Sequence, residues 1–510
     1  MSHLFHIFHI FRKDLRRYWP YILALSCLTA VQAALYGRLH LDFAGFTTGS
    51  DRARHILESA LGFGWPFLAA VVIYEDSLPG STQDWLFRPI GWRKLLAAKC
   101  LFVLIAVVLP NIIADACSVA LLGLDPFEYL PGLLARHALR VAGLLLPVLA
   151  VATLTTGIPQ GVVAIVAIVA VQGILSTLVE SSSDLMGGFE WLRFMSFYAV
   201  VAVFCLAIVI RQYATRLTTQ HRPALALGCI LVFFVPTRFP ASVAGLAQRA
   251  LAPQASSPVR VEFDSIRTGP MAGAIPSPIF RGTNVVYLPI RFDGMPAGLQ
   301  ARVHRVTVEL QTPEGQRWAS TPTRPVYQGQ DGTGSWLAVH LPKEFFERHG
   351  SERIRGSARL AVALYSASTP ATVIAGSPPV RISGIGLCGA TPGARHAART
   401  IFAWCAQPFQ QPRHLVMTVT PAGAPVPGVV RSTGSTNLFN PLPADFDFDP
   451  ISVARVIFAP ADSEYTFDAG VLPAGSKLDG AKVTITQLTP VSLADVTLVI
   501  PDIVLRDHSI

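Results

Sequence analysis

Long apolar runs dominate the first part of the chain, and short alternating runs dominate the second. Up to residue 239, polar positions come mainly as short breaks between apolar stretches. From residue 258 onward, apolar and polar residues alternate over short distances, as in Val303–Leu310, with Pro and Gly between the runs. A membrane helix needs ~20 mostly apolar residues, whereas a half-buried strand needs alternation. The pattern therefore predicts a helical membrane half followed by a β-rich half.

Six or seven membrane spans are predicted within a transmembrane domain at residues 18–239. The candidate spans are Tyr18–Tyr36, Ile56–Tyr74, Leu96–Leu122, Leu139–Thr156, Gly161–Val179, Trp191–Ile210 and Pro223–Val235. The seventh is short and reaches the required length only if residues 237–239 are included. Residues 1–17 combine helically spaced Leu and Phe with a basic end, which is typical of a helix lying in the membrane interface.

Basic residues predict the orientation of this domain. Cations cluster at residues 12–17, 88–99 and 211–222, whereas the alternate loops are mixed or acidic, as at Glu180–Glu190. Because Lys and Arg concentrate in cytoplasmic loops, these three clusters and the N-terminus should be cytoplasmic. Seven spans would then place the C-terminal half outside the cytoplasm.

The second half has the signature of antiparallel β-sandwiches. Residues 240–257 are interpreted as a linker. Nine strand-like runs follow: Val259–Phe263, Val285–Phe292, Val303–Leu310, Trp336–Leu341, Leu360–Tyr365, Leu415–Val419, Val453–Phe458, Val483–Leu488 and Val496–Ile500. Some 250 residues of this kind favour two modules, at 258–388 and 412–510, divided by residues 389–411.

Composition agrees with a membrane protein and excludes several functions. Hydrophobic residues make up 51% of the chain and charged residues 14%. The net charge of +9 is spread over span ends rather than gathered in a block, so a nucleic-acid partner is not expected. The chain has no phosphate-binding loop and no metalloprotease or nucleophile-elbow motif, so we expect neither enzymatic activity nor a cofactor.

Two groups that resemble metal ligands are given the simpler interpretation. His3, His6 and His9 recur every three residues without an acidic or Cys partner, and we interpret them as interfacial. Asp445, Asp447 and Asp449 alternate as in a calcium loop, but Pro450 stands where an EF-hand has Gly. No metal site is predicted.

Cysteine positions predict one disulfide. Five of the seven cysteines lie in or beside apolar spans, and only Cys388 and Cys405 lie in the second half. A lone pair in a non-cytoplasmic domain indicates a disulfide, whereas in the cytoplasm both would be free thiols.

Polar residues within the predicted spans are few. Asn111 and Asp115 follow Pro110 and lie four residues apart, on one helix face. Polar groups at this depth are costly and tend to face a bundle interior, so the two residues are candidates to line a pathway. The alternative is that they bond to a neighbouring helix or reach the outer interface.

The polar stretch Glu75–Lys99 carries the most specific motif. It reads EDSLPGSTQDWLFRPIGWRKLLAAK, and together with KDLRRYWP at Lys13–Pro20 and RQYATR at Arg211–Arg216 it resembles bacterial type-2 ABC exporter permeases. The resemblance covers the membrane half only. It implies an elbow helix before the first span and a first cytoplasmic loop that contacts a separate ATPase subunit. It places Asp84, Trp85, Arg88 and Pro89 at or near that contact.

The residues themselves support a docking surface less specifically. Trp and Arg frequently anchor interfaces, which favours docking for Trp85 and Arg88. Trp92, Arg93 and Lys94 lie nearer the third span and are interpreted as a membrane belt. A seventh span and a large outer domain depart from the six spans common in the family.

The resulting hypothesis is a permease subunit of an ABC exporter. The resemblance implies a multi-pass protein of the bacterial inner membrane that pairs with a separate ATPase and with a second permease, either an identical copy or a similar chain. The alternative hypothesis is a membrane-anchored extracytoplasmic β-sandwich protein that binds or assembles envelope components without transport. The substrate is not predicted.

Overall fold

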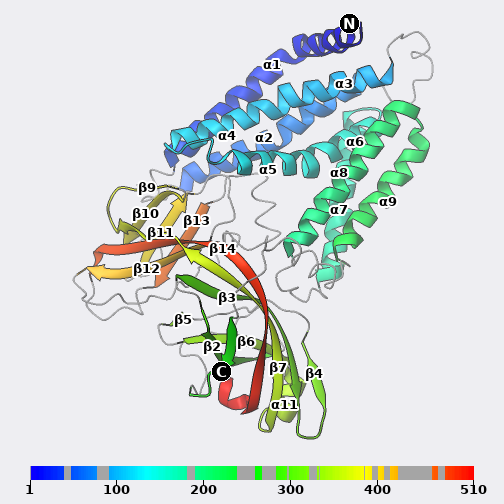
Figure 1. Ribbon diagram of the computed structural model, residues 1–510. Coiled ribbons are helices and arrows are strands. Elements are labelled where there is room, and N and C mark those ends of the chain that lie inside the picture. Colours follow the sequence, from blue (N-terminus) through cyan, green and yellow to red (C-terminus); the bar gives the residue numbers. More distant parts are fainter. Residues whose placement is uncertain are drawn as a thin grey trace.

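A helical half and a β-sheet half make up the chain (Figure 1). The computed structural model describes residues 2–39, 48–76, 91–180, 190–237, 259–266, 283–295, 298–320, 330–331, 334–383, 385–392, 400–406, 414–422, 462–468 and 477–509. The proposed linker, the predicted strand Val453–Phe458 and the acidic loop Asp445–Asp449 lie outside these residues. The predicted order of the two halves is confirmed.

The helices of the N-terminal half follow the predicted apolar runs. They are α1 (Ser2–Leu39), α2 (Thr48–Tyr74), α3 (Trp92–Phe102), η1 (Val103–Val108), α4 (Leu109–Leu121), α5 (Leu130–Arg140), η2 (Val141–Leu145), α6 (Leu146–Leu154), α7 (Ile158–Glu180), α8 (Glu190–Thr215) and α9 (Thr218–Thr237). α3, η1 and α4 form one continuous helix, and so do α5, η2 and α6.

Four helices in the described part of the chain are long and apolar enough to cross a membrane. They are Leu4–Leu35, Trp92–Leu121, Leu130–Leu154 and Ser196–Thr215, and two shorter apolar helices are Ser59–Tyr74 and Ile158–Val171. Large apolar side chains such as Phe5, Phe63 and Val203 are at least 70% exposed. Exposed apolar surface on long helices is what a lipid environment requires. The helical half is therefore a membrane domain.

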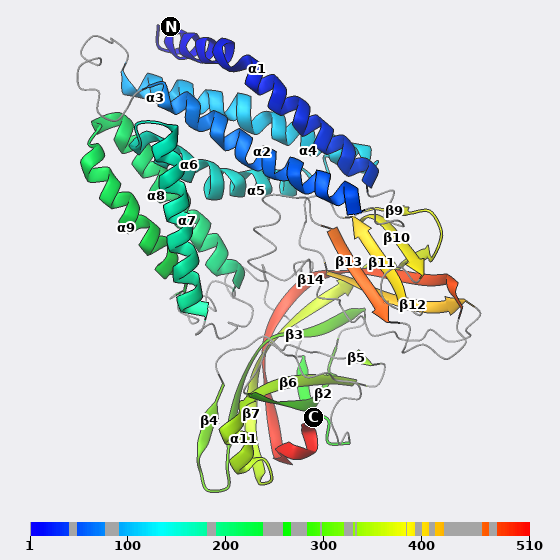
Figure 2. The ribbon, with the colours of Figure 1, turned by 180° about the vertical axis from the view of Figure 1, so that it is seen from behind.

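The first helix is longer than predicted. Residues 1–17 were expected to form a separate interfacial helix, but α1 continues from Ser2 to Leu39 with Pro20 inside it. Figures 1 and 2 show that α1 is bent. Proline removes a helical hydrogen bond and bends the helix that contains it. The interfacial residues and the first predicted span are thus two arms of one helix.

Two π-helical segments interrupt the membrane helices. η1 ends just before Leu109–Pro110, and η2 ends just before Leu146–Pro147. A proline ring clashes with the carbonyl four residues earlier, and the wider π turn accommodates that carbonyl. The helix that contains Pro110 therefore has a π segment in the turn before the proline.

The first β-sandwich packs two sheets around one apolar core. One sheet has the order β1-β2-β6-β5, and the facing strands are β4, β3, β7 and the C-terminal part of β14. The bounds are β1 (Arg260–Phe263), β2 (Thr283–Asp293), β3 (Leu299–Gln311), β4 (Arg317–Ala319), β5 (Gln330–Asp331), β6 (Gly334–Pro342), β7 (Arg353–Ala367) and β14 (Lys477–Val504). Core side chains such as Leu288, Leu337 and Val362 are at most 2% exposed. Full burial of such a side chain contributes ~1.5–3 kcal/mol.

Two short helices lie at the far end of this sandwich. α11 (Lys343–His349) follows β6, and η4 (Leu505–His508) follows β14. The His508 ring in η4 packs edge-on against Phe263, with 5.9 Å between ring centroids. These helices cover one end of the core.

The second β-sandwich shares a strand with the first. Its sheet β13-β11-β10-β9 faces β12, the N-terminal part of β14, and β8. The bounds are β8 (Ala371–Ile374), β9 (Val380–Ile382), β10 (Gly386–Pro392), β11 (Thr400–Ala406), β12 (His414–Ala422) and β13 (Asp462–Asp468). Its core includes Cys388, Ala403, Val419 and Val483, all fully buried.

Strand β14 joins the sandwiches, so they are not consecutive in sequence. Its start pairs with β12 and β8, and from Thr489 it pairs with β7. Val483–Leu488 and Val496–Ile500, expected as two strands, both belong to it. Residues 389–411, expected as a divide, include paired segments of β10 and β11 in one sheet, and the second sandwich begins at β8 instead.

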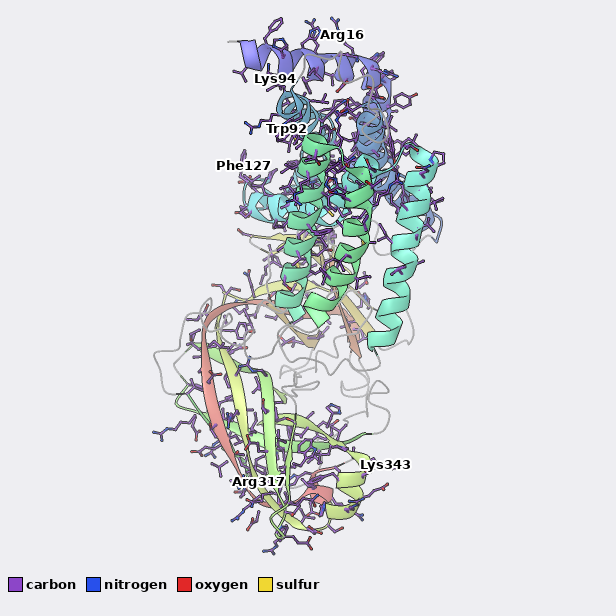
Figure 3. The ribbon with its side chains drawn as sticks, turned by 90° about the vertical axis from the view of Figure 1, so that its right-hand side faces the viewer. Arg16, Trp92, Lys94, Phe127, Arg317 and Lys343 are labelled. Carbon is purple, nitrogen blue, oxygen red and sulfur yellow. A yellow bond between two sulfur atoms is a disulfide. The ribbon has the colours of Figure 1, made fainter. Side chains whose placement is uncertain are left out.

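The β half lies at one end of the helical half (Figure 2). Gly123, in the turn after α4, adopts φ +71° and lies against Arg381 of β9, where a Cβ atom would come within 1.9 Å of the guanidinium carbon. Arg16, Trp92 and Lys94 lie at the opposite end of the helices, far from Arg317 and Lys343 of the β half (Figure 3). Cationic helix ends and the β half are therefore on opposite sides of the membrane domain.

Candidate functional sites

The predicted docking residues themselves are not positioned by the structure. Asp84, Trp85, Arg88 and Pro89 all lie in residues 77–90, outside the described residues. The structure does describe the two ends of this segment, which are Asp76 in the turn after α2 and Gly91 before α3. The candidate docking site is therefore described through the residues that flank segment 77–90.

A buried cluster of charged residues lies beside this segment and includes Asp76. Lys99 Nζ donates to Asp14 Oδ2 over 3.0 Å and lies 3.3 Å from Asp76 Oδ1. It also donates to the Val72 carbonyl over 3.0 Å, and Tyr213 Oη donates to Asp76 Oδ2 over 3.1 Å. We call Asp14, Asp76, Lys99 and Tyr213 the lysine cluster.

The lysine cluster ties four parts of the membrane domain together. Asp14 belongs to α1, Asp76 follows α2, Lys99 belongs to α3 and Tyr213 lies near the end of α8. A second ion pair, between Arg17 and Glu75, joins α1 to the same turn. Both ends of residues 77–90 are thereby fixed to the helical bundle.

Charge balance makes the lysine cluster unusual. The side chains of Lys99, Asp14 and Asp76 are only 3%, 3% and 7% exposed, so one ammonium faces two carboxylates away from water. Buried ion pairs rarely stabilise a fold more than apolar residues of similar volume would, because desolvation offsets the attraction. Removing one partner, however, leaves an uncompensated buried charge. Such a cluster favours one arrangement of the helices over others.

A second polar cluster joins α4 to α5. Asp115 Oδ2 lies 3.1 Å from Arg136 Nη1 and 3.0 Å from His137 Nε2. Arg136 and His137 are 2% and 4% exposed. Asp115 therefore bonds to residues of a neighbouring helix. This bonding was predicted as an alternative to a pathway role.

A cavity of about 60 Å³ adjoins this cluster. Asn111, His137 and Arg140 line it together with Gln32 of α1 and Trp65 of α2. Asp115 does not line the cavity but holds the His137 ring at its edge. Of the two predicted pathway residues, Asn111 thus faces the cavity directly and Asp115 acts through His137.

The two π segments form part of the cavity wall. Val107 and Val108 of η1 and Val141, Leu144 and Leu145 of η2 all line it. The Asn111 side chain donates to the Val107 carbonyl over 2.7 Å, which satisfies a backbone acceptor where the helical ladder shifts. π segments occur frequently at functional sites, where they displace side chains from regular helical positions.

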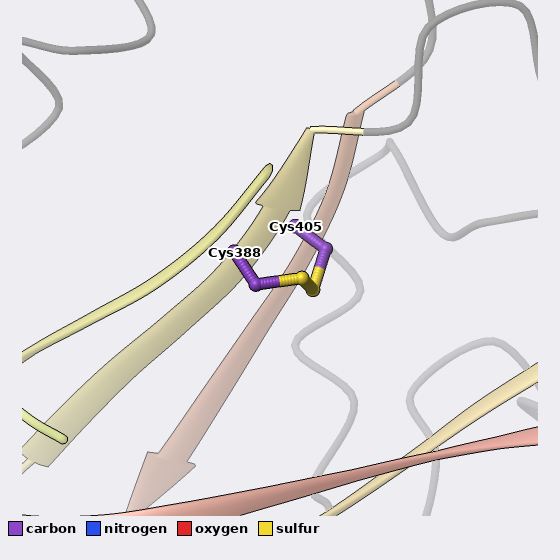
Figure 4. The surroundings of a disulfide bond; sticks show 2 residues. All are labelled: Cys388 and Cys405. Carbon is purple, nitrogen blue, oxygen red and sulfur yellow. A yellow bond between two sulfur atoms is a disulfide. The ribbon is translucent and has the colours of Figure 1, made fainter. Parts of the chain in front are cut away.

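The predicted disulfide between Cys388 and Cys405 is confirmed (Figure 4). The two residues face each other in register across β10 and β11, with 4.1 Å between Cα atoms. Both are fully buried in the second sandwich core. Cys27, Cys100, Cys117, Cys205 and Cys229 are free.

Several site residues were not predicted as such. Lys99 was counted only as a cation of the first loop, and Asp14, Asp76, Tyr213, Arg136 and His137 were given no role. A signal was present, because Asp14 is an acidic residue among four cations and Lys99 is a charge within an apolar helix. Charges at such positions usually have a partner.

Comparison with known proteins adds no assignment. No family model, curated protein or solved structure matches the chain. The architecture alone therefore defines its class, which is a helical membrane protein with a C-terminal all-β domain and one disulfide.

Proposed function

We propose that the chain is a membrane permease subunit of an ATP-driven exporter. In this proposal, residues 77–90 receive a separate ATPase through Asp84, Trp85, Arg88 and Pro89. The lysine cluster is the observation that carries the proposal. It anchors both ends of the docking segment to α1, α3 and α8, so a displacement of that segment must move these helices.

Anchoring of this kind is what coupling requires. A bound partner can shift the helical bundle from one arrangement to another only if its contacts with the bundle differ between the two arrangements. Lys99 Nζ contacts the carboxylate of Asp14 in α1, the carboxylate of Asp76 in the turn after α2, and the carbonyl of Val72 in α2. A shift in the docking segment would redistribute these bonds. ATP hydrolysis itself belongs to the partner in this proposal.

The proposed topology puts the N-terminus in the cytoplasm of a bacterium and the β half outside it. All seven predicted apolar runs then cross the inner membrane. Cationic residues such as Arg16 and Lys94 at the end remote from the β half support this orientation (Figure 3). The disulfide supports an oxidising location for the β half. A second permease copy would complete the translocator.

A second candidate function is a membrane-anchored β-sandwich protein that binds or assembles envelope components without transport. The two apolar sandwich cores, one of which contains a disulfide, favour this second function. This function uses the β half and needs no ATPase. The lysine cluster would then serve only to fix the helices.

Capture of an ATPase separates the two functions. The tagged full-length chain, purified from its native membrane, should retain a soluble ATPase. The double substitution Trp85→Ala and Arg88→Ala should abolish retention, whereas Trp92→Ala, in the predicted membrane belt, should not. Retention by the double variant would refute the docking surface. Absence of any ATPase from the parent preparation would favour the second function.

A further inference from the structure

Two hollows meet in the membrane domain and differ in polarity. A half-enclosed cavity of about 60 Å³ has Gln32, Asn111 and His137 among its wall residues. Beside it lies an open groove of about 400 Å³ between α4, α5, η2, α6 and α8. Val108, His137 and Val141 line both hollows, so together they form one recess with a polar end and an apolar end.

The polar end of this recess presents hydrogen-bond acceptors. Because the Asp115 carboxylate can only accept, His137 Nε2, 3.0 Å from Asp115 Oδ2, carries the ring proton and Nδ1 is left as an acceptor. The Asn111 amide donates to the Val107 carbonyl, which leaves Asn111 Oδ1 as a second acceptor. Neither acceptor has a hydrogen-bond partner among the described residues, although His137 is only 4% exposed. A buried acceptor without a donor is costly, so this end is suited to a ligand that donates a hydrogen bond.

Neither sign of charge is favoured at the polar end. Arg136 and His137 already engage the Asp115 carboxylate, so it is not free to hold a cation. Arg140 in the cavity wall has an interaction of its own and is coupled to Asp115, so it is not free to hold an anion. A charged group is also costly within a membrane span. An uncharged donor such as a hydroxyl group meets all of these conditions.

The apolar end of the recess is suited to an alkyl chain. Apart from His137, its wall consists of Ala, Val, Leu and Ile side chains. Ala138, Ala142 and Ala202 leave room between the helices because their side chains are small. The groove is open along helices whose exposed surface is apolar, so a chain already in the bilayer can enter sideways without crossing water.

The recess lies in the half of the membrane domain that is nearer to the β half. The span Leu130–Leu154 begins shortly after Gly123, which lies against Arg381 of β9. At ~1.5 Å per residue, His137 is about 10 Å from the start of that span. From His137 the groove continues along α5 and η2 to Leu146, past the middle of the span. A molecule with its head at His137 and its tail toward Leu146 therefore has the orientation of a lipid in the leaflet that faces the β half.

We propose that this recess binds an uncharged amphiphile from that leaflet, with a hydroxyl head and a long alkyl tail. The hydroxyl donates to Nδ1 of His137, the polar residue that borders both hollows, and accepts from the Gln32 amide in the same cavity wall. The tail lies in the groove along Ala138 and Ala142. The polar cavity has room for about four water molecules, which favours a small head over a bulky one. This site does not depend on the proposed transport and would also serve a non-transporting membrane protein.

Binding is tested with the full-length chain in phosphatidylcholine nanodiscs and a hexadecanol probe that carries a photoreactive diazirine in its chain. Labelling should be saturable, should map to peptides of α5 and α8, and should be displaced by hexadecanol. About tenfold more hexadecyl methyl ether should be needed for the same displacement, because the ether keeps the tail but cannot donate to His137 Nδ1. Equal displacement by the alcohol and the ether would overturn the hydroxyl assignment.

A permanently charged competitor tests the uncharged head. Hexadecyl sulfate has a similar tail, carries an anionic head and cannot donate a hydrogen bond. It should displace the probe no better than the ether does. Displacement by the sulfate at a lower concentration than the ether requires would overturn the uncharged head. Labelling that none of the three competitors reduces would overturn the binding site as a whole.

Variants locate the binding to this recess. His137→Phe should remove the preference for the alcohol over the ether, and this ratio is read only from chains that still bind the probe. Ala138→Phe should block the tail without touching a polar group. Ala135→Phe is its matched control, since Ala135 lies on the same helix, is also exposed and lines neither hollow. A tenfold preference that persists in His137→Phe, or parental labelling of Ala138→Phe, would overturn the proposal.

Discussion

Lys99 Nζ donates to Asp14 Oδ2 over 3.0 Å and thereby joins two helices through residues 85 positions apart in sequence. Neither side chain is more than 3% exposed. The same ammonium lies 3.3 Å from Asp76, so its removal would affect two carboxylates at once. Substitutions in the lysine cluster should therefore affect the packing of several helices.

Lys99→Met should destabilise the membrane domain more than Asp14→Asn does. The first change leaves two buried carboxylates without a cation and should cost about 3–5 kcal/mol. The second leaves Lys99 paired with Asp76, so one cation faces one carboxylate and the cost should be smaller. Thermal unfolding of the full chain in nanodiscs measures both. Lys94→Met is the control, since Lys94 makes no described ion pair; a parental midpoint for Lys99→Met would show that the cluster is not structural.

Replacing Cys388 and Cys405 together by Ala should lower the stability of the second sandwich by ~3 kcal/mol, because the disulfide restricts the unfolded chain. The loop that it closes spans a sequence separation of 17. Circular dichroism of the strands during heating detects the change, and reductant should shift the parent in the same direction. Cys27→Ala, at an exposed free cysteine, should have no effect. If the double variant and the parent melt alike, the disulfide contributes no stability.

Acid should destabilise the first sandwich. Burial lowers the pKa of His340 in β6 and of His508 in η4, although Asp507 partly offsets this for His508. Below the unfolded-state pKa of about 6.5, the unfolded chain binds protons that the folded chain does not, so stability falls as pH decreases toward the folded-state pKa. Melting temperatures across this range should decline with falling pH. His508→Gln should reduce the slope, whereas a slope unchanged by replacing both histidines would exclude them as the cause.

The orientation of the β half can be tested by a fusion. Alkaline phosphatase joined after Ile510 should be active, because the enzyme folds with its own disulfides only outside the cytoplasm. A fusion truncated after Arg216, between α8 and α9, should be inactive. Activity of the truncated fusion together with inactivity of the full-length fusion would reverse the proposed topology and remove the argument that the Cys388–Cys405 disulfide forms in the cell.

The polar residues near the cavity and the disulfide cysteines could be predicted because they depend on local features. Asn111 and Asp115 were recognisable as polar groups in an apolar helix, and Cys388 and Cys405 as the only two cysteines of the second half. Their partners were not recognisable, because Arg136 and His137 lie on another helix and their contacts depend on how the helices pack. The shared strand β14 was also missed. Its two halves were predicted as separate strands, but the strand continues through a register shift between Pro490 and Ser492.

The sequence by itself determined where the long apolar helices and half of the described strands lie, because apolar length and alternation are local properties that burial selects. It also determined that only one cysteine pair was available to the β half. The tertiary structure alone decided that Lys99 meets Asp14 and Asp76, that two π segments border one polar cavity, and that one strand serves two sandwiches. Each of these depends on contacts between segments far apart in the chain, and packing geometry rather than local composition sets such contacts.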